Sequence, residues 1–225
     1  TFTGATGTAP YTFYYRINGG PLLNVTSAGN IATVNAPTNI PGTYIYTLVS
    51  VTDASSTTCS QLQTGTATIL IHPLPTAAFS NSNPQCPGIA VDFTDQSLPN
   101  AGALTTWSWN FGDGVGTSAV QNPSYTYASA NSYTVTLTVT DNSGCTASTT
   151  QSVVVNSTPV VNFSAPTTSG CAPLNVSFTN TSTSATIYTW NFGDGSPASS
   201  TTAPSHIYTT PGTYSVTLTA SNTGC

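Results

Sequence analysis

The sequence predicts an all-β protein made of tandem β-sandwich modules. Residues 109–114 read W-N-F-G-D-G and return letter for letter at residues 190–195, an offset of 81 residues that also relates the segments after each copy. A repeat of that length indicates tandem domains. Apolar residues alternate with Thr or Ser in segments that recur about every 8 to 12 residues, which is typical of sheets with one buried and one solvated face. No segment has a convincing helical pattern.

The repeat divides the chain into three expected modules, at residues 1–73, 74–157 and 158–225. In the first, a β-rich segment at 11–17 ends at Asn18-Gly19, a strong hairpin signal. Further strands are expected at 45–52 and at 66–71. The segment His72-Pro73-Leu74-Pro75 predicts a short, stiff linker, because proline fixes φ and favours extended geometry in its predecessor.

The second module supplies the most complete set of strands. They are expected at residues 77–80, 89–94, 105–111, 117–120, 123–127, 133–140 and 149–155. The third module repeats this plan, with Phe163 in the place of Phe79 and Phe178 in the place of Phe93. We therefore expect the same sandwich twice.

The two ends of the chain depart from the plan. The first module begins at the counterpart of residues 92–94, so that it lacks a first strand, and the third module lacks the strand that the second has at 149–155. We expect the chain to be part of a longer array. The alternative is that neighbouring copies supply the missing strands, which would give a filament assembled head to tail by strand addition.

The pattern W-x-F-G-D-G, then P-S-x-x-Y, then Y-x-V-x-L-x-V resembles the PKD domain, an immunoglobulin-like β-sandwich common in microbial surface proteins, and it covers residues 75–225. The resemblance implies immunoglobulin-like modules arranged as an elongated rod. The family often has Asp where Asn110 and Asn191 stand, and its His in P-x-H-x-Y survives only as His206, with Tyr125 at the other copy. The surroundings of the cysteines resemble those in large adhesins of gliding and other Bacteroidota-type bacteria, many of which are exported by the type IX system.

The amino-acid composition limits the classes of partner that the chain can bind. Charged residues make up 3% of the chain, with six Asp, a single Arg and a formal net charge of −5. Nucleic acid and polybasic membrane anchoring are excluded, because both need clustered Lys and Arg. No apolar run is long enough to insert in a membrane. Five cysteines favour an oxidising compartment, so we expect an extracellular protein of the cell surface.

Most candidate site residues have a structural interpretation. The aromatic pairs Trp109 with Phe111 and Trp190 with Phe192 could stack on sugars, but they alternate on a strand that should be central, so core packing is preferred. Tyr133 and Tyr214 each open a long strand after a turn, as tyrosine-corner residues do.

Carboxylates and histidine are expected in turns. Asp113 and Asp194 each stand alone between two glycines, so a turn in which Asp accepts backbone hydrogen bonds is preferred to a calcium or catalytic site. The resemblance implies that His206 braces the same turn. No cofactor is expected; calcium bound near module ends by Asp53 and Asp141 is the weaker alternative.

The cysteines allow two pairings. Within modules, Cys86 would pair with Cys145 and Cys171 with Cys225. However, alternating strands place these partners at opposite ends of a sandwich, roughly 20 Å apart, whereas a disulfide needs Cα atoms within about 7 Å. The other pairing joins Cys86 to Cys225 across modules and leaves Cys59, Cys145 and Cys171 for further modules. Both stay open on the sequence.

These observations favour a non-enzymatic structural or adhesive repeat region of a large secreted cell-surface protein. Its expected partners are neighbouring modules of the same chain and other protein subunits or surface glycans. The alternatives are the filament subunit described above and an accessory region of a secreted hydrolase. None of the residues forms a catalytic motif.

Overall fold

The computed structural model describes residues 1–55, 59–82 and 85–225. In these ranges every regular secondary-structure element is a β-strand, which confirms the all-β fold class. The chain divides into two compact units, one formed by Thr1–Leu74, Asn100–Gly102 and Ser143–Cys145, the other by the remaining residues. No helix in the described ranges is long and apolar enough to cross a membrane.

The first unit is built on a four-stranded antiparallel sheet in the order β3-β2-β5-β6. These strands are β2 (Thr12–Ile17), β3 (Leu23–Thr26), β5 (Gly42–Thr52) and β6 (Ser60–Ile71). A second pair, β1 (Phe2–Thr3) with β4 (Ile31–Ala32), supplies the other layer. The β2–β3 hairpin turns at Asn18 and Gly19, which both have positive φ as the sequence signal requires.

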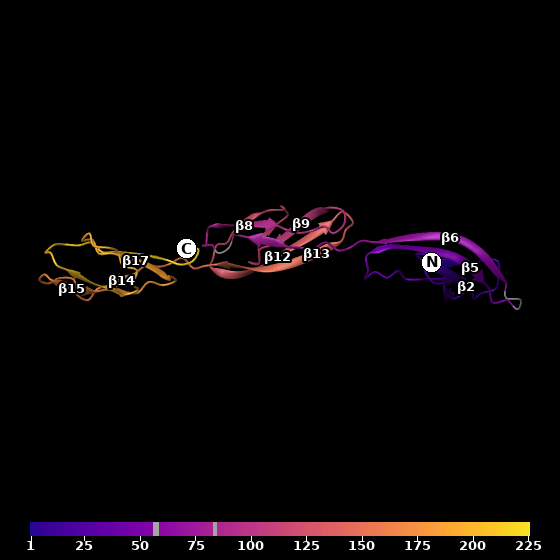
Figure 1. Cartoon of the computed structure of the whole chain (residues 1–225), viewed down its shortest axis with the longest axis horizontal. Coiled ribbons are helices and arrows are strands. Elements are labelled where there is room, and N and C mark those ends of the chain that lie inside the picture. Colours follow the sequence, from indigo (N-terminus) through magenta and orange to yellow (C-terminus); the bar gives the residue numbers. More distant parts are fainter. Residues whose placement is uncertain (56–58, 83–84) are drawn as a thin grey trace. The chain divides into compact units, whose positions relative to one another are not determined.

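The second unit contains a β-sandwich whose strands lie between residues 79 and 155, called the second module below. One sheet has the order β10-β9-β12-β13 and the other β11-β8-β7, and Figure 1 shows β9, β12 and β13 running alongside one another. The strands are β7 (Phe79–Asn81), β8 (Ala90–Asp95), β9 (Leu104–Asn110), β10 (Thr117–Ser118), β11 (Ser124–Thr126), β12 (Asn131–Asp141) and β13 (Thr146–Val155). β13 begins before the expected residue 149, because residues 146–148 pair with 138–140.

Inward-facing side chains of both sheets form one core in the second module. Trp109 lies at its centre, 1% exposed, against the rings of Phe79, Phe93 and Phe111. The remaining members are aliphatic and tyrosine side chains, namely Val91, Tyr127, Tyr133, Val135, Leu137, Val139, Val153 and Val155. Because β12 and β13 alternate inward apolar residues with outward Thr and Ser, one face of this sheet meets solvent.

Residues 158–225, called the third module below, repeat this plan with fewer paired residues. The strands are β14 (Phe163–Ser164), β15 (Leu174–Ser177), β16 (Thr179–Asn180), β17 (Ile187–Asn191), β18 (Ser205–Tyr208) and β19 (Thr217–Ser221). Trp190 is 0% exposed in a separate core with Val176, Phe178, Phe192 and Tyr208. Within these residues no strand takes the place that β13 has in the second module.

Candidate functional site at the Asp turns and the module junction

The Gly-Asp-Gly turn at the end of β9 is held by side chains that accept backbone hydrogen bonds. The Asn110 side-chain oxygen accepts from the Gly112 amide at 2.9 Å, and the Asp113 carboxylate accepts from the amides of Val115 and Gly116 at 3.1 and 2.7 Å. The third module repeats the arrangement with Asn191 and Asp194. The Asn residues that depart from the family pattern therefore still close the turn, without a charge.

A ring braces each turn from the neighbouring strand. The Tyr125 hydroxyl donates to the Asp113 carboxylate, and its ring stacks on Phe111 at 4.1 Å between centroids. In the third module the His206 ring stacks at 4.1 Å on Phe192, with Nε2 at 2.7 Å from Asp194 Oδ2. Tyrosine and histidine thus take the same place in the two copies, because each offers a flat ring and one polar atom at its far edge.

These contacts shift the titration of the turn carboxylates. The Tyr125 hydroxyl, followed by the Gly116 amide, holds the pKa of Asp113 below its ordinary value. The Ser196 hydroxyl, followed by the His206 ring, holds the pKa of Asp194 well below its ordinary value. Both carboxylates are therefore ionised acceptors in the folded state near neutral pH.

We expect Asp194→Asn to weaken the acid dependence of the third module. The pKa of Asp194 is lower in the folded chain than in the unfolded chain. The ionised carboxylate therefore stabilises the fold at pH values above the unfolded pKa of about 3.9. This contribution is lost as the pH falls through the folded pKa. Urea unfolding midpoints should therefore fall less between about pH 5 and pH 2 in the variant than in the parent chain. His206→Tyr, which copies the second module, is the control that keeps the carboxylate. Equal slopes for parent chain and Asp194→Asn would contradict the assignment.

Tyrosine hydroxyls tie the strand entries to the turns before them. Tyr133 donates to the carbonyl of Ser129 and Tyr214 to the carbonyl of Thr210, both at 2.8 Å, which is the geometry of a tyrosine corner. Tyr44 makes the same contact in the first unit, to the carbonyl of Ile40 at 3.0 Å. Tyr44 was not predicted as a tyrosine corner, although residues 41–44 share P-G-T-Y with residues 211–214.

The aromatic residues considered for sugar stacking lie in the cores. Trp109 and Trp190 are 1% and 0% exposed, and their indole N–H groups donate at 2.9 Å to the carbonyls of Val120 and Thr201. Phe111 and Phe192 are also buried. None of these faces is open to a ligand. The half-buried Trp107 instead donates from its indole to the Asp95 carboxylate at 2.7 Å.

The carboxylates considered for calcium do not gather. Asp53 lies in a turn of the first unit and accepts from the Ser55 hydroxyl at 2.7 Å and from the Thr8 amide at 3.3 Å. Asp141 is buried at the end of β12. Among the residues that the structure describes, no three His, Cys, Asp or Glu side chains are grouped to hold a metal ion.

A disulfide joins the second and third modules. Cys86, in the turn before β8, is bonded to Cys225, which follows β19. Asn156, in the segment that connects the two modules, adds hydrogen bonds to both sides of the junction. Its backbone amide donates to the Gln85 carbonyl at 2.9 Å, and its side-chain amide donates to the Thr223 carbonyl. The junction is therefore held by a covalent bond and by hydrogen bonds to backbone.

A second asparagine orders the third module's side of this junction. The Asn222 side-chain amide donates to the carbonyls of Ser157 and Ser184 at 2.8 and 2.7 Å, and its oxygen accepts from the Cys225 amide at 2.9 Å. This geometry places Cys225 toward Cys86. Within-module pairing, Cys86 with Cys145 and Cys171 with Cys225, is wrong in this structure, because Cys225 already carries the bond to Cys86.

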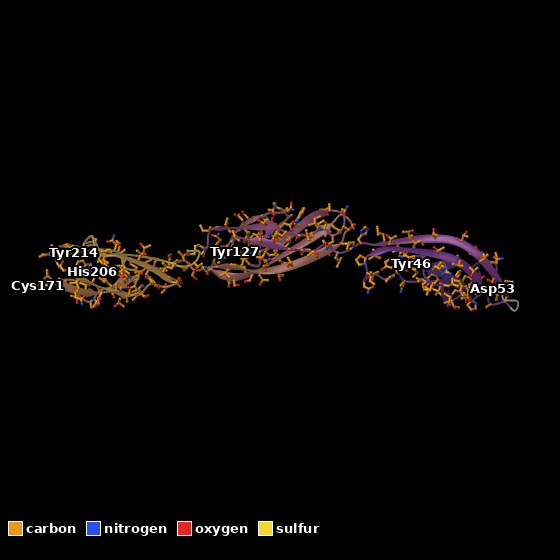
Figure 2. The ribbon with its side chains drawn as sticks, in the orientation of Figure 1. Tyr46, Asp53, Tyr127, Cys171, His206 and Tyr214 are labelled. Carbon is orange, nitrogen blue, oxygen red and sulfur yellow. A yellow bond between two sulfur atoms is a disulfide. The ribbon has the colours of Figure 1, made fainter. Side chains whose placement is uncertain are left out.

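The remaining cysteines lie elsewhere. Figure 2 shows Cys171 and Tyr214 at the end of the third module remote from the C-terminus marked in Figure 1. Cys171 is an exposed free thiol, Cys59 is exposed and Cys145 is half-buried. The separation of Cys171 from Cys225 follows from the alternating strand directions, which place the two turns at opposite ends of the sandwich.

Non-reducing peptide mapping should recover Cys86 and Cys225 in one linked peptide. Pepsin at acid pH suits this experiment, because low pH suppresses thiol exchange and the chain has a single Arg and no Lys for trypsin to cleave. Reduction before digestion should release the two peptides. A Cys86–Cys145 peptide in the unreduced digest would contradict the junction.

One comparison with known proteins identifies the module type. A family model described as PKD domain matches residues 72–156 and 156–225. The PKD1 domain of Vibrio anguillarum Epp is similar at 35% identity, over 37% of this chain and 94% of that chain, with a TM-score of 0.34. The PKD1 domain of the Vibrio cholerae metalloprotease PrtV is similar at 32% identity, over 37% and 98% of the two chains, with a TM-score of 0.34. A carbohydrate-binding module of the β-sandwich superfamily has 20% identity, over 66% and 84%, with a TM-score of 0.37.

Proposed function

Since the chain belongs to the PKD domain family, we propose that it is a non-enzymatic structural and adhesive repeat region of a large secreted protein of the cell surface. Its modules, at residues 1–73, 74–157 and 158–225, act as spacers that hold a binding part away from the surface. The observation that carries this proposal is the Cys86–Cys225 disulfide, which ties two modules together.

A bond between modules suits a spacer better than a bond within one. A disulfide inside a module stabilises that module against unfolding, whereas the Cys86–Cys225 bond restrains the angle between two neighbours. The side chains of Asn156 and Asn222 add hydrogen bonds to backbone at the same place. Restraining the joint limits bending, which is what a part that projects from a surface requires.

The side chains support a role without catalysis. His206 and Asp194, which are in ion-pair distance, both serve the turn after β17, and the His206 ring is stacked on Phe192. Because charged residues make up only 3% of the chain, the polar side chains of the surface are mainly those of Thr, Ser and Asn. Such a surface keeps its properties over a wide range of ionic strength, because charge screening has little to act on.

The mass of the reduced, denatured polypeptide from its natural source tests the proposal. A mass of several hundred kilodaltons, together with release of its peptides when intact cells are treated with protease, would support a surface spacer. A mass near 23.0 kDa would overturn it and favour the filament subunit. A large polypeptide with a hydrolase domain, recovered from the medium and not from cells, would favour the accessory-region alternative.

A further inference from the structure

The strand β6 forms a free edge of the four-stranded sheet in the first unit. It stands last in the order β3-β2-β5-β6 and, in the part of the chain that the structure describes, it pairs with β5 alone. Figure 1 shows it along one margin of this unit. All of its residues from Ser60 to Leu70 are exposed, so that both faces of the strand meet solvent.

This edge lacks most of the features that keep sheet edges apart. Native proteins protect their edges with short strands, charged side chains, proline or covering segments. β6 is 12 residues long, and its sequence, S-Q-L-Q-T-G-T-A-T-I-L-I, contains neither a charge nor a proline. A register shift against β5 between Gly65 and Leu62 adds twist but no charge. The edge strands β3 and β10, by contrast, have four and two residues.

The second module shows that this edge stays free when a first strand is present. There the first strand, β7, belongs to the other sheet, and the last strand, β13, still ends the order β10-β9-β12-β13. Among the described residues, the backbone of β13 bridges a further segment only at Val155, to Gln85. The counterpart of Val155 in β6 is Ile71, because each lies two residues beyond the partner of a corner tyrosine. Residues 60–70 therefore form an edge in a complete module as well.

The outward face of β6 is complementary to itself. Side chains two residues apart share a face of a strand, which here carries Leu62, Thr64, Thr66, Thr68 and Leu70. Leu62 and Leu70 are 88% and 56% exposed. Two β6 strands can pair antiparallel about a two-fold axis at Thr66. Leu62 of each copy then lies opposite Leu70 of the other, so that both leucine pairs are covered and no charges meet.

We propose that two copies of this chain associate through their β6 strands, which pair antiparallel from residue 62 to residue 70 and join the two sheets into one. The contact is isologous, so it closes at a dimer. Main-chain hydrogen bonds supply the attraction, and the leucine pairs set the register. One strand pair buries a small area, so the dimer is weak in solution and forms where copies are held close together.

The edge strand β13 provides a matched comparison within the same chain. It is 10 residues long and uncharged, but its outward residues are Thr and Ser apart from Val154, so a second copy would find no leucine pair to cover. Its edge is also tied to β7, because the Gln151 side chain donates to the Phe79 carbonyl at 2.6 Å. Thr150 takes the place of Thr66, since each lies opposite a threonine three residues after a corner tyrosine.

The test measures self-association of the whole unreduced chain by sedimentation equilibrium between about 10 µM and 1 mM, the range expected for small interfaces. N-ethylmaleimide first blocks the exposed thiols of Cys59 and Cys171, so that they cannot link copies covalently. We expect a reversible dimer. Thr66→Lys should weaken it at least about tenfold, because the two-fold axis places two like charges opposite each other. Thr150→Lys should leave it unchanged.

A second readout locates the axis. In a chain with Cys59→Ser and Cys171→Ser, Thr66→Cys should form a disulfide between copies on mild oxidation, because opposite residues of an antiparallel pair have Cα atoms about 4.5–5.5 Å apart. Thr68→Cys should not, since its two copies lie roughly 13 Å apart along the paired strands.

A chain that stays monomeric throughout the concentration range would overturn the proposal. So would a dimer that Thr66→Lys and Thr150→Lys weaken equally, or equal crosslinking through Thr66→Cys and Thr68→Cys. The dimer does not rest on the proposed spacer function, which the mass of the natural polypeptide tests, so either can fail without the other.

Discussion

Replacing Gly112 by alanine is expected to destabilise the second module by about 3–4 kcal/mol, enough to unfold a marginal domain. Gly112 has φ of +81°, and a Cβ there would lie 2.3 Å from the Thr134 carbonyl oxygen and 2.9 Å from its nitrogen. These are backbone atoms of β12, so that neither can rotate away. The strand or the turn must move, and Phe111 next to it would lose its place in the core.

Gly114 is the matched control for this prediction. It lies in the same turn with φ of +87°, but a Cβ there meets nothing within 4 Å. Gly114→Ala therefore reports the strain of the left-handed conformation alone, about 1 kcal/mol. Gly193→Ala and Gly195→Ala should rank in the same order, because a Cβ at Gly193 would lie 2.4 Å from the Ser215 carbonyl oxygen. Denaturant unfolding measures all four, and equal losses for Gly112→Ala and Gly114→Ala would refute the steric explanation.

Replacing Trp109 by alanine should cause a loss of similar size, about 3–5 kcal/mol. The indole is 1% exposed, contacts Phe79 edge-on at 5.1 Å between centroids and lies 5.5 Å from Phe93. Alanine would remove these ring contacts and leave a cavity in the core. Hydrogen exchange measured by mass spectrometry should show lost protection in β12 and β13, with residues of the third module unchanged.

Trp107 on the same strand provides the comparison. It is half-buried at the edge of the core, so Trp107→Ala should destabilise the module by clearly less than Trp109→Ala. Trp109→Phe should lose roughly 1 kcal/mol for the hydrogen bond to Val120 in addition to a smaller cavity. If Trp107→Ala proved as damaging as Trp109→Ala, the centre of the core would have been misplaced.

Several parts of the fold were predictable because the repeat and the alternation of side chains both depend on local sequence. Trp109 and Trp190 occupy equivalent core positions, as their shared six-residue motif predicted, and the Asn18-Gly19 signal correctly marked a hairpin. Strand starts were less accurate. β13 begins at Thr146, because its first residues pair with β12 although Ala147 is the single apolar residue among the first three.

Long-range contacts were harder to predict. The two cysteine pairings stayed open on the sequence, since spacing along the chain does not say which module end a turn occupies. The Tyr125 contact with Asp113 was missed because tyrosine replaces the histidine that the family pattern draws attention to. The hydroxyl bonds from Tyr127 to the Phe111 carbonyl and from Tyr208 to the Phe192 carbonyl were also missed, although both tyrosines keep their places in the repeat.

The Cys86–Cys225 bond determines which residues carry tension when the chain is pulled from its two ends. The covalent path runs from Thr1 to Cys86 and crosses the sulfur bridge to Cys225, so the 139-residue separation between them is bypassed. Unfolding within that loop cannot lengthen the chain, which withholds roughly 460–500 Å of extension. Of the second module, only the part before Cys86, including β7, can be drawn out, while residues 1–74 of the first unit lie wholly on the path.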